Sequence, residues 1–171
     1  TGIDGRQYEL DPEMTVIADE KCAEAIAGVM GGLASGCTEK TVNVFVEAAL
    51  FSPIRTATTG RKLNLQSDAR FRFERGIDSQ FLEHGMQIAS RLILDICGGE
   101  ASDIIKAGAA PDPSLPISFR PSRVKGLAGV DVEEEEMGRI FEVLGFEVSN
   151  EGEKWDVSVP SWRNDIVGEA C

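Results

Sequence analysis

A short proline-rich stretch divides this sequence into two parts that must each bury a core of their own. Residues 107–116 contain three prolines among small residues and show no helical or strand periodicity. Proline interrupts helices and central strands, so a stretch of this kind is typical of a linker. A chain of 171 residues can hold two small domains. We therefore expect one region over residues 1–106, a linker over 107–116 and a second region over 117–171.

The first region alternates segments with strand and helix patterns. Along residues 41–49 the side chains alternate between two faces, which predicts a strand with three valines on one side. Ser52 followed by Pro53 is typical of a helix start, and this helix is expected to reach about Leu63. Asp78 is expected to cap a second helix that ends at Gly98-Gly99. Further strands are expected over residues 7–10, 15–18 and 25–30.

The second region predicts a small unit of mixed structure. We expect a strand over residues 117–119, a short helix over 121–127, a helix over 133–144 capped by Asp131, and a hairpin formed by residues 146–149 and 154–159. The acidic run of residues 133–136 fills the first turn of its helix, where the helix dipole favours negative charge. Together the two regions predict an α+β chain with mixed sheets.

Composition narrows the classes of function. The net charge is −12, so any contact with nucleic acid must be local, through clustered arginines. The four cysteines are widely spread and the only histidine, His84, has no partner motif, which argues against a zinc site. We expect the cysteines to be buried free thiols of a cytoplasmic protein. No apolar run approaches the ~20 residues that span a bilayer, so no membrane role is expected.

The glycine-rich run from Gly28 to Gly32 has two interpretations. It lacks the lysine and the serine or threonine of a phosphate-binding loop, and its spacing departs from the dinucleotide-binding fingerprint. Glycines also allow a tight turn and the close approach of another group. The residues alone favour the turn.

Glu47 is a single carboxylate in an otherwise apolar segment. Burying it unpaired would be costly, so it must contact water or find a partner. From the residues alone, an ion pair with Arg55 or Arg72 is the more common arrangement, and a binding role is the alternative. Arg70 and Arg72 alternate with Phe71 and Phe73, which predicts a strand with one solvated face.

Four blocks of residues carry a resemblance to a known family. They are AIAGVMGGLASG at 25–36, EAALFSPIRTATTGRKLNLQSDARFRFERG at 47–76, and the motifs LGFEV and VPSWRNDI in the second region. These blocks resemble the β subunit of bacterial phenylalanine–tRNA ligase. The resemblance implies that residues 1–106 are the C-terminal part of its editing domain. It also implies that residues 117–171 belong to a small winged-helix-like β-α-α-β-β domain that is cut short at its C-terminal end.

The resemblance also implies a site. The residues that match the family's editing pocket are Gly28, Gly31, Glu47, Ser67 and Ala69, with Ser67 standing where relatives commonly have threonine. Glu47 would accept a hydrogen bond from the tyrosine hydroxyl that phenylalanine lacks, and Arg70 and Arg72 could contact tRNA. No catalytic residue is identified, and family hydrolysis is thought to use a positioned water. No metal ligand is identified either.

The implied function is a contribution to protein biosynthesis. The chain would supply part of the proofreading site that hydrolyses mischarged tyrosyl-tRNA, but not the aminoacylation site, and alone it is expected to be inactive. It would bind no cofactor, whereas ATP and Mg serve the whole enzyme. Its partners would be tRNA, tyrosine or phenylalanine, and the α subunit in an (αβ)₂ heterotetramer. The alternative is a non-catalytic interaction or tRNA-docking module.

Overall fold

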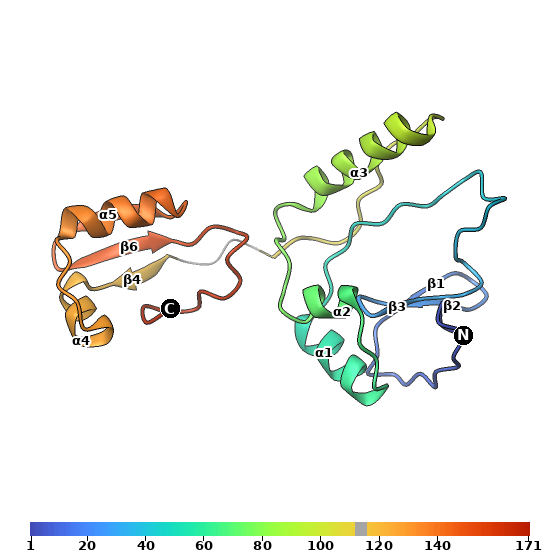
Figure 1. Ribbon diagram of the computed structural model, residues 1–171, viewed down its shortest axis with the longest axis horizontal. Helices are drawn as coiled ribbons and strands as arrows, with labels where there is room; N and C mark the ends of the chain where they lie inside the picture. Colours follow the sequence, from blue (N-terminus) through green and yellow to red (C-terminus); the bar gives the residue numbers. More distant parts are fainter. Residues whose placement is uncertain (112–115) are drawn as a thin grey trace. The chain divides into compact units, whose positions relative to one another are not determined.

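The computed structural model describes residues 1–111 and 116–171, and the chain divides into two compact units. Unit 1 comprises Thr1–Gly108 and unit 2 comprises Ala109–Cys171 (Figure 1). Part of the expected linker, residues 112–115, lies outside the described residues. No helix in the described chain is long and apolar enough to cross a membrane.

Unit 1 begins with a three-stranded antiparallel sheet of order β1-β2-β3. Its strands are β1 (Val16–Ala18), β2 (Ala23–Ile26) and β3 (Met30–Gly31). The expected strand at 15–18 is confirmed, whereas residues 7–10 form no strand. The expected strand at 25–30 is interrupted by a turn, because Gly28 has a positive φ of 67° and leaves the β conformation.

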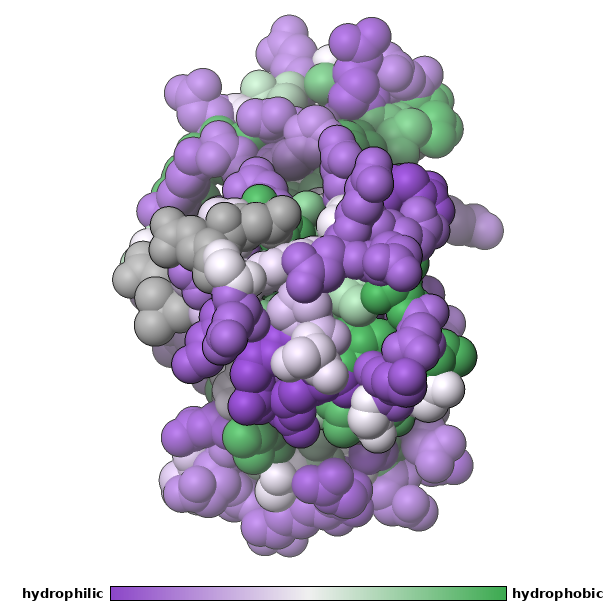
Figure 2. Space-filling view, turned by 90° about the vertical axis from the view of Figure 1, so that its left-hand side faces the viewer, coloured by the Kyte–Doolittle hydropathy of each residue, from purple (hydrophilic) through white to green (hydrophobic). Residues whose placement is uncertain are grey.

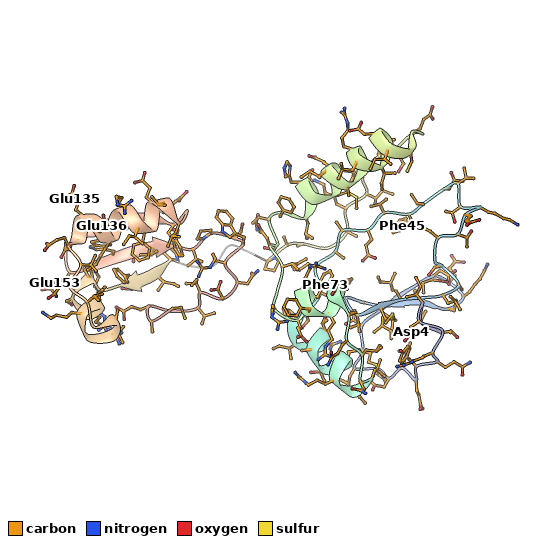
Figure 3. The ribbon with its side chains drawn as sticks, viewed as in Figure 1. Asp4, Phe45, Phe73, Glu135, Glu136 and Glu153 are labelled. Carbon is orange, nitrogen blue, oxygen red and sulfur yellow. The ribbon has the colours of Figure 1, made fainter. Side chains whose placement is uncertain are left out.

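The expected strand at 41–49 is wrong. These residues have no regular secondary structure, and Val42 and Phe45 are 90% and 93% exposed. Phe45 projects from the long connection that leads toward α1 (Figure 3). A strand requires a neighbour to complete its backbone hydrogen bonds. Within the described residues no strand pairs with this segment.

Three helices follow in unit 1. Helix α1 (Pro53–Lys62) begins as expected, because the Ser52 side chain accepts from the Arg55 amide. Residues 68–73 form helix α2 (Asp68–Phe73) instead of the expected strand. Its N-cap Ser67 accepts from the Arg70 amide, and such a cap outweighs a short alternating pattern.

Helix α3 (Leu82–Cys97) ends at Gly98 as expected, but it starts later than Asp78. Asp78 instead accepts from the amide of Gln80 in the preceding turn. His84 is an exposed residue of α3. The four cysteines are free, but all are exposed, so their expected burial is wrong.

Unit 2 has the element order expected from its sequence. Strand β4 (Ile117–Phe119), the 3₁₀ turn η1 (Pro121–Arg123), helix α4 (Val124–Ala128), helix α5 (Glu134–Val143), and strands β5 (Glu147–Glu151) and β6 (Lys154–Ser158) follow one another. The strands form an antiparallel sheet of order β4-β6-β5. Asp131 does not cap α5; it pairs with Lys125 at 2.6 Å, and the N-cap residue is Glu133.

The two units have separate cores. Unit 1 buries Ile26, Val29 and Leu65 against partly buried Tyr8, Met30 and Leu63. Unit 2 buries Met137, Phe146, Trp155 and Val157, with Phe119 and Phe141 packed against them. The face seen in Figure 2 is mostly hydrophilic, with apolar residues showing between the polar ones. The α+β class expected from the sequence is confirmed, since each unit combines helices with a small antiparallel sheet.

Candidate functional site

The turn between β2 and β3 is built around Gly28. The Val29 amide donates to the Ile26 carbonyl at 2.9 Å, which closes a four-residue turn with Gly28 in its third position. A positive φ at this position favours glycine over every other residue. This geometry agrees with the turn interpretation of the glycine run.

The outer side of Gly28 faces two aromatic rings. A Cβ atom added at Gly28 would lie 3.1 Å from Phe51 Cδ2 and 3.1 Å from Phe73 Cγ. The two rings have centroids 5.1 Å apart and are tilted by 47°. Phe51 precedes α1 and Phe73 is the last residue of α2. The contact of Gly28 with these two rings therefore packs the turn against both helices. At Gly31, by contrast, an added Cβ would meet no atom of the described residues within 4 Å.

Ser67 joins the glycine turn to α2. Its hydroxyl donates to the Val29 carbonyl at 2.5 Å and accepts from the Arg70 amide at 3.0 Å. A serine hydroxyl has one hydrogen to donate and two lone pairs. Its hydrogen is therefore in use, and one lone pair is left for a further partner. This arrangement brings together two of the segments that the family resemblance implies would line one pocket.

A surface hollow of about 450 Å³ lies over α2. It is lined by Gln66, Ser67, Asp68, Arg70, Phe71 and Glu74. Of the five residues expected to form a pocket, only Ser67 lines it. Ala69 is half-buried within α2.

Glu47 lies on the irregular segment that precedes Phe51 and α1. Within the described residues it makes no ion pair and no hydrogen bond, so the expected pairing with Arg55 or Arg72 is wrong. The residue is exposed overall, yet partial burial raises the pKa of its carboxyl above the ordinary value. The structure therefore brings Ser67 to the glycine turn, but it records no bond between Glu47 and these residues.

The two arginines of α2 have different surroundings. The Arg70 side chain is only 14% exposed and pairs with Glu74, whereas Arg72 is exposed and, among the described residues, its side chain reaches only the Asp68 carbonyl at 3.5 Å. Neither the Phe51–Phe73 pair nor the inward orientation of Arg70 was predicted from the sequence. Two signals could have indicated them: Gly60 inside α1, and phenylalanines just before α1 and at the end of α2.

Three potential ligand atoms gather at the β1–β2 turn. Asp19, Cys22 and Glu24 each offer one atom, and these lie within 4.8 Å of one another. A hydrogen bond to Glu24 is the main cause that raises the pKa of the Cys22 thiol. A thiol must lose its proton to bind a metal, so this interaction opposes ligation.

Unit 2 contains an apolar hollow of about 300 Å³ between its sheet, its helices and its C-terminal segment. Glu169 closes one side: it accepts from the Arg120 amide at 2.8 Å and from the guanidinium groups of Arg120 and Arg123. The hydrogen bonds from Arg120 are the main cause that lowers the pKa of Glu169 to about 2.

We expect Glu169 to make unit 2 sensitive to acid. Its folded pKa of about 2 lies below the ordinary value of 4.5, so its contacts stabilise the fold fully above about pH 4.5. That stabilisation is lost as the pH falls toward about 2. Both tryptophans lie in unit 2, so their fluorescence during urea unfolding reports the free energy of unfolding of that unit.

Between pH 4.5 and about 2, the free energy of unfolding of the Glu169→Gln variant should fall less than that of the wild type. The matched control is Glu153→Gln, which changes an exposed carboxylate in the β5–β6 turn (Figure 3). It should follow the wild-type pH dependence. An acid sensitivity unchanged in Glu169→Gln would contradict the assignment.

Comparison with known proteins gives the same two-part division. The B3/4 domain family matches residues 1–98, and the tRNA synthetase B5 domain family matches residues 117–170. The phenylalanine–tRNA ligase β subunit of Paramagnetospirillum magneticum is 53% identical over 168 residues, 98% of this chain. Those of Cereibacter sphaeroides and Bradyrhizobium diazoefficiens are 48% and 47% identical over 98% of the chain.

The chain spans about a fifth of the length of these relatives, 20% or 21% of each. The resemblance identified from the sequence blocks is thereby confirmed over nearly the whole chain.

Proposed function

The chain belongs to the B3/4 domain family, and from that premise we propose that unit 1 supplies part of a proofreading site in a phenylalanine–tRNA ligase β subunit. The site would hydrolyse tyrosyl-tRNA that has been formed in error on the tRNA for phenylalanine. Its pocket would be bounded by Gly28, Gly31, Glu47, Ser67 and Ala69. Aminoacylation, with its ATP and Mg, would take place elsewhere in an assembly with the α subunit.

The observation that carries this proposal is the unused carboxylate of Glu47. Its carboxylate makes no ion pair in the described chain and is partly shielded from water, so it is available to accept a strong hydrogen bond from a ligand. The phenolic hydroxyl of tyrosine is such a donor, and phenylalanine has none. A site built to bond a hydroxyl can reject the analogue that lacks it by about 10⁴-fold or more.

The other residues support the pocket by shape. Gly31 leaves open space where a side chain would project. Ser67 holds α2 to the Val29 carbonyl and retains one lone pair. These features suit the binding of an amino acid side chain. The water that attacks the ester would be positioned by groups of the complete site.

For unit 2 we propose a scaffolding role toward the tRNA or the partner subunit. It matches the tRNA synthetase B5 domain family. The first turn of α5 carries Glu134, Glu135 and Glu136, and its Arg139 is already paired with Glu136 at 2.7 Å. This helix therefore repels phosphates, and a tRNA contact would use another surface of the unit.

Glu47→Ala tests the proposed site. In the full-length subunit assembled with its partner, we expect phenylalanine charging to stay near normal and hydrolysis of preformed tyrosyl-tRNA to slow. Losing one hydrogen bond to a charged group costs about 1.5–3 kcal/mol, which corresponds to about a 10- to 150-fold lower kcat/KM. Deacylation of radiolabelled tyrosyl-tRNA measures this effect directly.

Glu39→Ala is the matched control, because Glu39 is an exposed carboxylate on the same connection. It should deacylate at the wild-type rate. Wild-type deacylation by Glu47→Ala would place tyrosine recognition elsewhere. The alternative function, a non-catalytic docking module, would be favoured if the wild-type assembly itself failed to deacylate tyrosyl-tRNA.

A further inference from the structure

Arg70 points into unit 1 instead of toward solvent. Its side chain is only 14% exposed, although arginine is among the residues least often buried. Nε donates to Glu74 Oε2 at 2.9 Å, and Nη1 donates to the Leu65 carbonyl. The guanidinium therefore joins the loop before α2 to the residue that follows α2.

The Arg70 side chain packs against the buried face of helix α1 at Gly60. The buried face of α1 consists of Thr56, Thr59 and Gly60. A Cβ atom added at Gly60 would lie 2.3 Å from both Cδ and Nε of Arg70. Contacts this short do not occur in proteins, so Arg70 can occupy its position only because residue 60 has no side chain.

The same arginine is connected to the glycine turn through Ser67. Its backbone amide donates to the Ser67 hydroxyl at 3.0 Å, and that hydroxyl donates to the Val29 carbonyl at 2.5 Å. Val29 is only 1% exposed and belongs to the core of unit 1. A continuous set of contacts thus runs from α1 through Arg70 and Ser67 to the β2–β3 turn.

We propose that Arg70, seated on Gly60, is a positioning residue that fixes Ser67 and the glycine turn at the spacing the proofreading pocket requires. This inference rests on the proposed function. It assigns Arg70 a role distinct from the tRNA contact that its charge suggests. The Arg70 side chain is only 14% exposed and its charge is paired with Glu74, so its guanidinium is poorly accessible to a phosphate.

Arg72 provides a matched comparison. It lies on the same six-residue helix and is exposed, and within the part of the chain that the structure describes its side chain makes a single long hydrogen bond, at 3.5 Å, to the Asp68 carbonyl. Replacing either arginine with lysine keeps the charge. Only at position 70 does it remove the planar fork that reaches two acceptors at once.

The first experiment compares Arg70→Lys with Arg72→Lys in the full-length subunit assembled with its partner. For Arg70→Lys we expect kcat for deacylation of tyrosyl-tRNA to fall about 10- to 100-fold, because a small displacement of the groups that position a substrate lowers the rate by such factors. KM for the tRNA should stay unchanged, and Arg72→Lys should have wild-type kcat. Hydrogen exchange of peptides covering residues 64–71 should accelerate only in Arg70→Lys.

A second variant, Gly60→Ala, displaces Arg70 without changing any charge. Alanine is the better helix former, so α1 itself should remain intact. The added methyl group should push the guanidinium from its seat and reproduce the kcat loss of Arg70→Lys. If either variant retained wild-type kcat, the inference would be overturned, even with faster exchange. A loss expressed in KM and dependent on salt would overturn it too, because a phosphate contact behaves in that way.

The outcomes separate this inference from the function on which it rests. A wild-type assembly that does not deacylate tyrosyl-tRNA would contradict both the proofreading function and the positioning role of Arg70. An active wild type together with wild-type kcat in Arg70→Lys and Gly60→Ala would contradict only the positioning role. Normal deacylation by Glu47→Ala together with impaired Arg70→Lys and Gly60→Ala would remove Glu47 from the site and retain the role of Arg70.

Discussion

Replacing Trp155 with alanine is expected to destabilise unit 2 by about 3–5 kcal/mol, the usual cost of truncating a buried aromatic side chain. Trp155 is only 2% exposed on the central strand β6. Its ring centroid lies 5.7 Å from that of Phe119 and 6.5 Å from that of Phe141. The substitution therefore leaves a cavity where the sheet meets α5. Urea unfolding followed by the fluorescence of Trp162 measures the change.

The control is Trp162→Ala, which removes the same side chain from a position that is 60% exposed. Its unfolding, followed by Trp155 fluorescence, should change by well under the 3–5 kcal/mol expected at the core, because surface substitutions are usually within about 0.5 kcal/mol. Equal losses in the two variants would show that Trp155 is not the centre of this core.

Helix boundaries with local signals could be predicted from the sequence. Ser52-Pro53 marks the start of α1 and Gly98 marks the end of α3, since a cap acts on amides within a few residues of it. The caps proposed for Asp78 and Asp131 were wrong. Short polar side chains also stabilise isolated turns and surface ion pairs, and sequence alone does not distinguish these uses.

Strand predictions depended on partners that the pattern does not reveal. Residues 117–119 and the hairpin form strands because each has a neighbour in the sheet of unit 2. Residues 41–49 have an equally clear alternation but no partner among the described residues, so they form no ladder. Residues 70–73 show how a cap decides between two short patterns: Ser67 holds the first turn of α2, and the alternation has no effect.

The candidate site was predictable only in part, for the same reason. The turn at Gly28 follows from its glycine, which is a local property. The seat of Arg70 on Gly60 and the rings of Phe51 and Phe73 against Gly28 are contacts between segments far apart in the sequence. No spacing rule relates such pairs, and here an arginine expected on a solvated face proved to be a structural connection.

Gly28→Ala is the second substitution with a large expected effect. Holding a non-glycine residue at a positive φ costs about 1–2 kcal/mol. The new Cβ would also press on Phe51 and Phe73 at 3.1 Å, and overpacking of this kind typically costs about 1–3 kcal/mol. We expect a total loss of about 2–4 kcal/mol, allowing for relaxation of the rings. The Val29 amide donates to the Ile26 carbonyl across the turn, so its native-state hydrogen exchange measures this loss of stability.

Gly31→Ala separates the stability of the turn from its proposed use. An added Cβ meets no atom within 4 Å there, and Gly31 is not among the glycines with positive φ. The opening free energy from exchange of the Val29 amide in Gly31→Ala should therefore match that of the wild type within about 0.5 kcal/mol. If the open space beside Gly31 receives the amino acid, the same methyl group should slow tyrosyl-tRNA deacylation in the assembled enzyme. Normal deacylation by a stable Gly31→Ala variant would show that the open space is not the pocket, while a stable Gly28→Ala variant would show that the aromatic pair does not seat the turn.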